Sequence, residues 1–282
     1  MCRFFGVLST SSVEAAEPLV GAPQSLLWQS DADPKRRQSD GWGVGWFVGP
    51  RAQIAKSPKP MYRQRRRLLR IANAVRSLAV VGHVRWASNP LKLSKQALLG
   101  TAHTQPFQYR DWIFAHNGTL YIPREVTAHL GPAWAKRIRG KNDSEVLFYW
   151  LMRYLNPALS GNSPRVAEAG RRVRQAIRGI DTIWSGCRNR YPLHKFPYHG
   201  LNWILTNGRL LLAFCYADPR GYGASKALAD RRQPYYQLQR QVTKDRLTIA
   251  SEPLDPAKTW EPFRHGELLV AVRNKRILRT RS

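Results

Sequence analysis

The sequence is short of acidic side chains, of cysteine and of long apolar runs. Its 282 residues include 18 Asp and Glu against 46 Lys and Arg, which gives a formal net charge of +28. The three cysteines (Cys2, Cys187 and Cys215) are too few and too far apart for a disulfide framework or a metal-ligand cluster. No apolar run is long enough to cross a membrane, and we find no secretory signal. We therefore expect a globular, cytoplasmic protein that binds no metal.

The excess of positive charge is a reason to consider nucleic acid as a partner. However, the basic residues are spread along the chain, and the densest run, Arg63-Gln64-Arg65-Arg66-Arg67, opens a segment with helical periodicity. The sequence has no zinc-finger spacing, no RNA-recognition motif and no helix-turn-helix signature. A generally basic protein without a specific polyanion partner is the favoured interpretation.

Apolar residues recur at the spacing of a strand in short segments near both ends of the chain. The predicted strands are residues 3–9, 40–48, 79–86, 112–116, 201–206, 209–216, 247–251, 267–272 and 276–278. Asn207-Gly208 predicts a hairpin turn, and Asn117-Gly118 is expected to end a strand. Glycines within residues 40–48 indicate that another part of the backbone comes close to this strand.

The middle of the chain carries helical periodicity. The predicted helices are residues 62–77, 142–155 and 163–180, and Leu78 continues the spacing of the first. Asn142-Asp143-Ser144-Glu145 has the acceptor and the acidic first turn of a helix start, and Asn156-Pro157 is expected to end this helix. Strands, then helices, then strands again, without a repeat or a linker, predict a single α+β domain over residues 2–282.

Cys2 directly follows the initiator methionine, so trimming of Met1 would leave a thiol and a free α-amino group on one residue. An α-amino group has a pKa of about 7.7–8.0 and a thiol one of about 8.5. The amine can therefore accept the proton of a nucleophile near neutral pH. Alone, the pattern is weak, because most residues near a chain end have no such role.

Other candidate site residues lie at the ends of predicted strands or at a helix start, where side chains can converge on one pocket. Arg85 could clamp a carboxylate through two parallel hydrogen bonds. Asn117-Gly118 could supply a side-chain amide and a backbone N–H to an oxyanion. Asp143 could bind an α-ammonium group. Each also has an ordinary explanation, which is a structural arginine, a turn or a helix cap.

Together, Cys2, Arg85-Trp86, His116-Asn117-Gly118 and Asn142-Asp143-Ser144-Glu145 resemble the class II (N-terminal-nucleophile) glutamine amidotransferases. The start Met-Cys-Arg-Phe-Phe-Gly, the turn Asp40-Gly41-Trp42-Gly43 and the stretch Ser251-Glu252-Pro253-Leu254-Asp255 are most similar to the stand-alone branch, which includes YafJ-type proteins and γ-glutamyl hydrolases. The resemblance runs from Cys2 to about Leu278. It implies a four-layer αββα sandwich, in which two antiparallel sheets face each other and helices lie outside.

The resemblance also implies a mechanism without a cofactor. Cys2 would attack a γ-glutamyl amide with its own α-amino group as base, and Asn117 and Gly118 would form the oxyanion hole. The glutamyl group would be bound by the other members of the motifs: Arg85 at its α-carboxylate, Asp143 at its α-ammonium group, and Trp86 and Ser88 along the pocket.

One motif departs from the family pattern. Gln105, in His103-Thr104-Gln105-Pro106-Phe107, stands where a histidine is common, so we expect Gln105 in the substrate pocket, with His103 as the alternative. We see no second domain, and the expected activity is hydrolysis of glutamine or another small γ-glutamyl amide. The alternatives are a glutaminase subunit that delivers ammonia to a separate synthase, or a basic nucleic-acid-binding protein that kept the fold without its chemistry.

Overall fold

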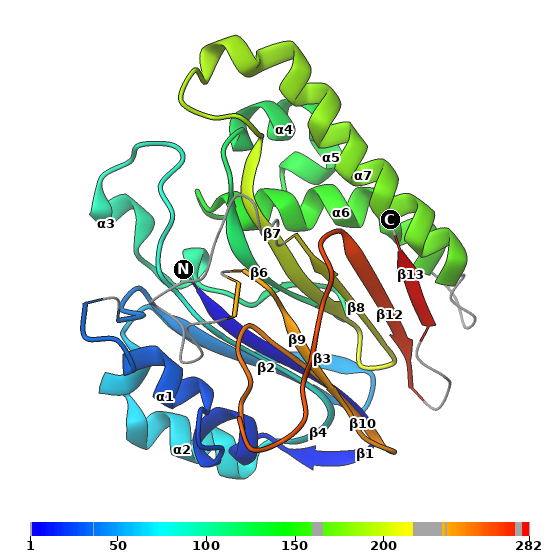
Figure 1. Ribbon diagram of the computed structural model, residues 1–282. Coiled ribbons are helices and arrows are strands. Elements are labelled where there is room, and N and C mark those ends of the chain that lie inside the picture. The colour runs from blue at the N-terminus through cyan, green and yellow to red at the C-terminus, as the bar shows by residue number, and fades with distance from the viewer. Residues whose placement is uncertain are drawn as a thin grey trace.

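Two antiparallel sheets, packed face to face, form the centre of the protein (Figure 1). The computed structural model describes residues 2–35, 37–159, 166–216, 233–234, 236–273 and 278–281. The seven-stranded sheet has the order β11 (Glu261–Pro262), β9 (Gln239–Val242), β10 (Arg246–Ala250), β1 (Arg3–Glu14), β4 (Arg76–Val84), β2 (Trp42–Val48) and β3 (Arg51–Ser57). The six-stranded sheet has the order β13 (Leu278–Arg281), β12 (Glu267–Val272), β8 (Leu210–Cys215), β7 (Tyr198–Thr206), β6 (Trp112–Leu120) and β5 (Phe107–Tyr109).

Helices cover the outer face of each sheet (Figure 1). On the seven-stranded sheet lie α1 (Leu26–Asp31), α2 (Arg65–Ala74) and a π-helical turn, η1 (Glu17–Gly21). On the six-stranded sheet lie α4 (Pro123–Leu130), α5 (Pro132–Ala135), α6 (Asp143–Leu159) and α7 (Val166–Cys187). The remaining short helices, on connecting loops, are α3 (Lys95–Leu98), η2 (Met61–Arg63), η3 (Thr101–His103) and η4 (Arg188–Arg190).

Three separate apolar layers hold these four layers of backbone together. Neighbouring residues of a strand point to opposite faces of its sheet. Phe4 of β1 accordingly lies in the layer between the sheets, whereas Phe5 lies in the layer under α1 and α2. In β6, Ile113 faces the other sheet, and Phe114 stacks on Phe148 of α6 with ring centroids 5.1 Å apart. The αββα sandwich expected from the sequence is therefore confirmed.

The glycines of β2 mark the close approach predicted for them. A Cβ atom on Gly43 would lie 2.3 Å from the carbonyl oxygen of Gln105, and one on Gly45 would lie 2.9 Å from the side chain of Ile113. A side chain at either position would push the two sheets apart. This contact fixes the segment around Gln105 against the sheet that carries Cys2.

Three predicted element boundaries are wrong. Asn117-Gly118 does not end its strand, because β6 passes through it to Leu120 with a bulge between Gly118 and Thr119. Asn156-Pro157 does not end α6, which continues to Leu159; a proline this close to a helix end removes only one backbone hydrogen bond. Leu78 belongs to β4, which begins at Arg76 because it pairs with β1 from that residue.

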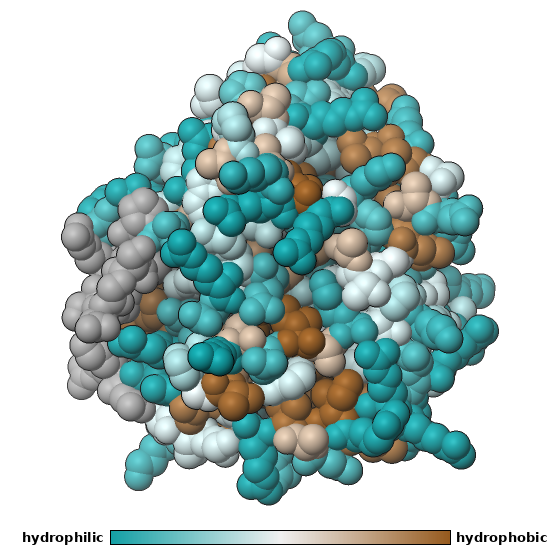
Figure 2. Space-filling view, turned by 180° about the vertical axis from the view of Figure 1, so that it is seen from behind, coloured by the Kyte–Doolittle hydropathy of each residue, from teal (hydrophilic) through white to brown (hydrophobic). Residues whose placement is uncertain are grey.

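The hairpin of β7 and β8 around Asn207-Gly208 is confirmed, with Thr206 opposite Leu211. Strands β3, β5, β9 and β11 and helices α4 and α5 had no sequence prediction. Residues 163–165 and 276–277 of two predicted elements lie outside the described residues. Among the residues that the structure describes, no helix is long and apolar enough to span a membrane. Figure 2 shows a largely hydrophilic face on which apolar side chains form separate small patches.

Candidate active site

Cys2 lies at the start of β1, in the interior of the seven-stranded sheet, where β4 and β10 flank that strand. Its side chain is buried, and Sγ lies 3.4 Å from both the backbone N and the backbone O of Trp86, just beyond the end of β4. The two strands are antiparallel, with Arg3 opposite Val84, so the start of β1 meets the end of β4. This register explains why residues 2 and 85–86 share one site. Met1 lies outside the described residues.

A buried ion pair fixes the residues that follow Cys2. Arg3 pairs with Glu252, and both side chains are about 5% exposed or less. Nη1 of Arg3 also donates to the carbonyl oxygen of Cys2 at 3.2 Å. Ser251 contacts Phe4 twice, since its hydroxyl accepts from the Phe4 amide at 3.1 Å and its amide donates to the Phe4 carbonyl at 3.0 Å. Sequence reasoning quoted both motifs but missed this pairing, which depends on how β1 and β10 are aligned.

Arg85 has one half of its guanidinium fixed and the other half without a partner. Nη1 donates to the carbonyl oxygens of Leu98 at 2.8 Å and Asp40 at 3.4 Å. The side chain is buried, and within the described part of the chain it has no ion pair and no bond from Nε or Nη2. The Asp40 carboxylate accepts from the Ala87 amide at 2.8 Å, which holds the segment after Arg85. Arg85 can thus offer two parallel N–H groups to a carboxylate.

Asp143 is the buried anion of the site. It is the first residue of α6 and is 2% exposed. One carboxylate oxygen accepts from the Ser88 hydroxyl at 3.0 Å and the other from the Leu120 amide at 2.8 Å. No cation pairs with it among the described residues. Ser88 therefore contributes to the site by orienting Asp143. The Asp143 carboxylate can still accept hydrogen bonds from an ammonium group.

Asn117 is buried without a hydrogen bond. It is 1% exposed, and neither Nδ2 nor Oδ1 has a partner in the described structure. A Cβ atom on the next residue, Gly118, would lie 2.1 Å from the carbonyl oxygen of Gly200, so only glycine fits there. Buried amides almost always have partners, and an exception calls for a ligand or a functional role. Sequence reasoning identified both residues.

Gln105 lies beside Asn117 with its amide bonded to β6. Oε1 accepts from the His116 amide at 2.6 Å, and Nε2 donates to the His116 carbonyl at 3.0 Å and to the Ser144 hydroxyl at 3.4 Å. His103 lies on a half-buried loop, where its ring accepts from the Lys141 amide at 3.1 Å. Gln105 is thus the residue at the buried position. Its contact with a substrate stays a prediction.

Trp86, predicted to line the pocket, contacts Cys2 through its backbone, and its side chain is 37% exposed. His83, in β4 just before Arg85, and His116, next to Asn117 in β6, are fully buried. Burial lowers the pKa of each imidazole to about 3, so both are neutral at physiological pH. Neither can serve as a positive charge in the site.

Burial also disfavours each charge of the site. It raises the pKa of the Cys2 thiol and of the Asp143 carboxyl and lowers the pKa of the Arg85 guanidinium, because each charged form loses hydration. The charges of Arg85 and Asp143 both act on Cys2, the first favouring the thiolate and the second opposing it. These three groups therefore share one poorly hydrated environment. No cluster of three or more metal-binding side chains occurs among the described residues.

Comparison with known proteins places this arrangement in a family. The chain is 33% identical over 287 residues to the gamma-glutamyl-hercynylcysteine sulfoxide hydrolase of Mycobacterium tuberculosis, covering 99% of this chain and 96% of the relative. It is 24% identical over 253 residues to YafJ of Escherichia coli, covering 85% of this chain and 87% of YafJ. A glutamine aminotransferase class-II domain protein from Silicibacter pomeroyi shares the fold, with a TM-score of 0.59, 16% identity and 99% coverage of both chains. The family model of the class-II glutamine amidotransferases matches residues 1–281, and the chain belongs to that family.

Proposed function

We propose that the protein hydrolyses a γ-glutamyl amide through a thioester on Cys2. One observation carries the proposal: beside a buried thiol, the site holds a guanidinium, a carboxylate and an amide whose hydrogen-bonding capacity is incompletely used. Leaving such groups buried costs free energy unless a ligand completes their bonds. The glutamyl head has the complementary groups, since it carries one carboxylate and one ammonium.

The head of the substrate would bind between Arg85 and Asp143. The free Nε and Nη2 of Arg85 would clamp the α-carboxylate, and the Asp143 carboxylate would accept from the α-ammonium group. Ser88 and the Leu120 amide already orient Asp143, so its carboxylate is fixed before the substrate arrives. This arrangement selects a free α-amino acid head and leaves the γ-carbonyl to reach Cys2.

In the chemical step, Sγ of Cys2 forms a bond to the γ-carbonyl carbon, and its proton passes to the α-amino group that removal of Met1 exposes. Negative charge develops on the carbonyl oxygen, where Nδ2 of Asn117 and the amide of Gly118 would donate. The carbon–nitrogen bond then breaks, and the leaving amine takes the proton. Water hydrolyses the thioester, which releases glutamate and restores the thiol.

The leaving group is proposed to be either ammonia or a larger amine, and in both cases it is released to water. The relative from M. tuberculosis is named for a γ-glutamyl compound other than glutamine, and it matches nearly the whole of this chain. Delivery of ammonia to a separate synthase is the alternative. It predicts turnover of glutamine that rises when the partner is added, whereas a hydrolase needs no partner.

The test is amine release from glutamine and from a panel of γ-glutamyl amides, with the matching α-glutamyl amides as controls. We expect turnover of γ-glutamyl compounds alone, because only they combine a free α-amino acid head with a distal amide. Intact mass after reaction with a glutamine-analogue electrophile should show one adduct, at Cys2. A Cys187→Ser variant should label normally, since Cys187 lies at the end of α7. Absence of both release and labelling would contradict the proposal.

A further inference from the structure

A cleft of about 510 Å³ lies between the edge of the six-stranded sheet and the start of α6. It is lined by Tyr109 at the end of β5, by Arg110 in the turn that follows, by Lys136, Arg137 and Arg139 between α5 and α6, and by Tyr149 of α6. We call it the Tyr149 cleft. Four of these side chains are cations, and the lining that the structure describes includes no acidic residue.

The four cations lack counter-ions in the described structure. None of Arg110, Lys136, Arg137 and Arg139 forms an ion pair or donates a side-chain hydrogen bond there. The carboxylate that acts on Arg139 is that of Glu145, which is buried and accepts from the backbone amides of Arg139 and Gly140 at 3.1 and 2.8 Å. Arg110, Lys136 and Arg139 are exposed, so solvent screens their mutual repulsion, and Arg137 is the half-buried cation of the cleft.

Arg137 is held in position by aromatic rings. Its guanidinium carbon lies 4.8 Å from the ring centroid of Tyr109 and 5.5 Å from that of Trp134. The rings of Tyr109 and Trp134 meet edge to face with centroids 5.3 Å apart. The Nε of Arg137 is buried and has no hydrogen-bond partner among the residues that the structure describes. The cation–π contacts restrict the guanidinium, and its N–H groups remain available for an anion.

Tyr149 adds an uncharged hydrogen-bond donor to the lining of the cleft. The residue is 6% exposed, lines the cleft, and its hydroxyl has no hydrogen bond among the described residues. Its pKa is raised by burial and by the charge of Glu145, so the hydroxyl is protonated and is a donor to an anion.

We propose that the Tyr149 cleft binds a small molecule through a pyrophosphate or two adjacent phosphate groups. Four cations without an anion match a ligand of several negative charges better than a single carboxylate. Guanidinium groups bind phosphate oxygens in pairs, and a volume of about 510 Å³ is within the range of small-molecule sites. The guanidinium groups of Arg110 and Arg137 both lie over the Tyr109 ring, so this ring positions arginine rather than stacks on a base.

The test is calorimetric titration of the full chain with inorganic pyrophosphate, and with inorganic phosphate as the weaker ligand. We expect one pyrophosphate site per chain, and binding weakened about tenfold or more by the double substitution Lys136→Gln/Arg139→Gln, which removes two charge-assisted contacts. The matched control is Arg65→Gln/Arg66→Gln, which removes two exposed charges from α2 and should change the affinity by less than about twofold. Tyr149→Phe should weaken binding while the fold is kept.

Three results would overturn the proposal. They are no saturable binding of pyrophosphate, an equal loss in the α2 control, or binding of duplex DNA alone with a steep salt dependence, which would make the cleft part of a polyanion surface. Because none of these measurements uses amide hydrolysis, failure here would leave the proposed activity of Cys2 untouched.

Discussion

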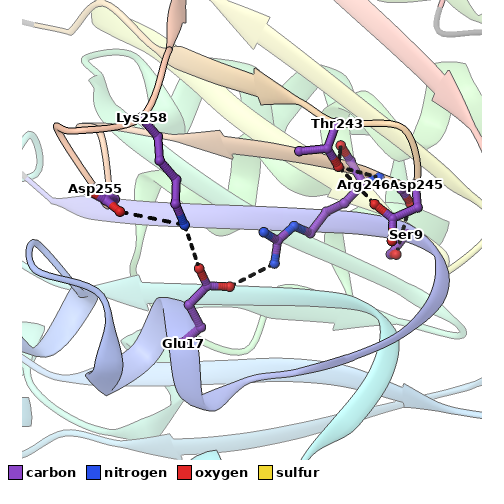
Figure 3. Close-up of polar contacts among 7 residues, drawn as sticks. All are labelled: Ser9, Glu17, Thr243, Asp245, Arg246, Asp255 and Lys258. Atoms are coloured by element: carbon purple, nitrogen blue, oxygen red, sulfur yellow. Dashed lines mark hydrogen bonds and ion pairs between the residues drawn. The ribbon is translucent and has the colours of Figure 1, made fainter.

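Charged groups are arranged in opposite ways in two regions of this protein. Near the start of η1, Glu17 binds Arg246 at 2.8 Å and Lys258 at 3.1 Å (Figure 3). Burial alone would raise the pKa of Glu17, but the hydrogen bonds from these two cations outweigh it and lower the pKa. In the site, Arg85 and Asp143 are buried more deeply, and neither has an ion-pair partner among the described residues.

The difference separates groups that stabilise the fold from groups that await a ligand. The Glu17 network is complete without any ligand, and it joins η1, β10 and the loop that contains Asp255 (Figure 3). The site keeps charged and polar groups buried at a cost in stability. That cost is recovered when a zwitterionic substrate binds. Substitutions should therefore affect activity and stability differently in the two regions.

Cys2→Ser should give the largest loss. The hydroxyl can keep the contacts with the Trp86 backbone but is a far poorer nucleophile at neutral pH, so we expect kcat to fall by roughly 10³-fold or more with little change in the unfolding free energy. Steady-state kinetics and urea denaturation test both statements. Cys187→Ser is the control and should remain active. Full activity of Cys2→Ser would exclude Cys2 as the nucleophile.

Glu252→Gln should destabilise the fold by about 3–5 kcal/mol, because it removes the negative charge that pairs with buried Arg3. Replacing both residues, as Arg3→Leu/Glu252→Leu, should restore much of the stability. It should not restore kcat, since the contact from Arg3 to the Cys2 carbonyl is still missing. Recovery of both quantities in the double variant would show that the pair supports the fold only.

Asn117→Ala should lower kcat by roughly 10²–10³-fold, as expected for a lost oxyanion donor. It should not destabilise the fold as a buried asparagine usually would, because neither amide atom has a partner among the described residues. The matched control is Asn202, which lies opposite Asn117 in β7 and bonds Tyr216 N and Tyr236 O. Asn202→Ala should cost about 1–3 kcal/mol. Equal destabilisation by the two substitutions would contradict the comparison.

Arg85→Lys and Arg85→Ala should weaken substrate binding in that order. Loss of a buried charge-assisted contact corresponds to roughly 2–5 kcal/mol, or about 30-fold and upward in KM. Without substrate, Arg85→Ala should be tolerated by the fold, whereas Arg240→Ala should destabilise it, since buried Arg240 pairs with Glu267 at 2.5 Å. Unchanged kinetics in both Arg85 variants would make this residue structural.

Glu17→Gln should have the smallest effect. Its partners remain largely hydrated, and half-exposed ion pairs contribute about 0–1 kcal/mol. We expect unchanged kinetics and a small loss of stability that disappears at high salt. A change in kcat would mean that the contacts of η1 affect the geometry of the site.

The sequence predicted the site residues better than their connections. Cys2, Arg85, Asn117 and Asp143 follow from short motifs, because the chemistry of each depends on residue type and place in the chain. The pairing of Arg3 with Glu252 depends on strand register between residues 249 positions apart, which the sequence does not display. Likewise, the motif around Gln105 does not indicate that the oxygen and the nitrogen of its side-chain amide both bind the backbone of His116 in β6.

The fold was predictable where apolar periodicity was strong and where turns had their usual residues. Two of the wrong boundaries, at Asn117-Gly118 and at Leu78, have one physical cause, which is that pairing with a neighbouring strand overrides local signals. Asn117-Gly118 has the composition of a turn, yet β7 continues alongside β6 as far as Leu120. Edge strands such as β5, only three residues long, have too little pattern to detect.

The place of Cys2 in the chain also has a consequence for biosynthesis. β1 needs β10 beside it, and Phe5 lies opposite Ala250, so the strand that begins next to Cys2 cannot be completed on both sides until nearly the whole chain has been made. At a translation rate of about 5–20 residues per second, this delay is roughly 10–50 s. During it, the N-terminal segment lacks its final partner and is open to the enzymes that trim nascent chains. Once β10 docks, the same residues are buried.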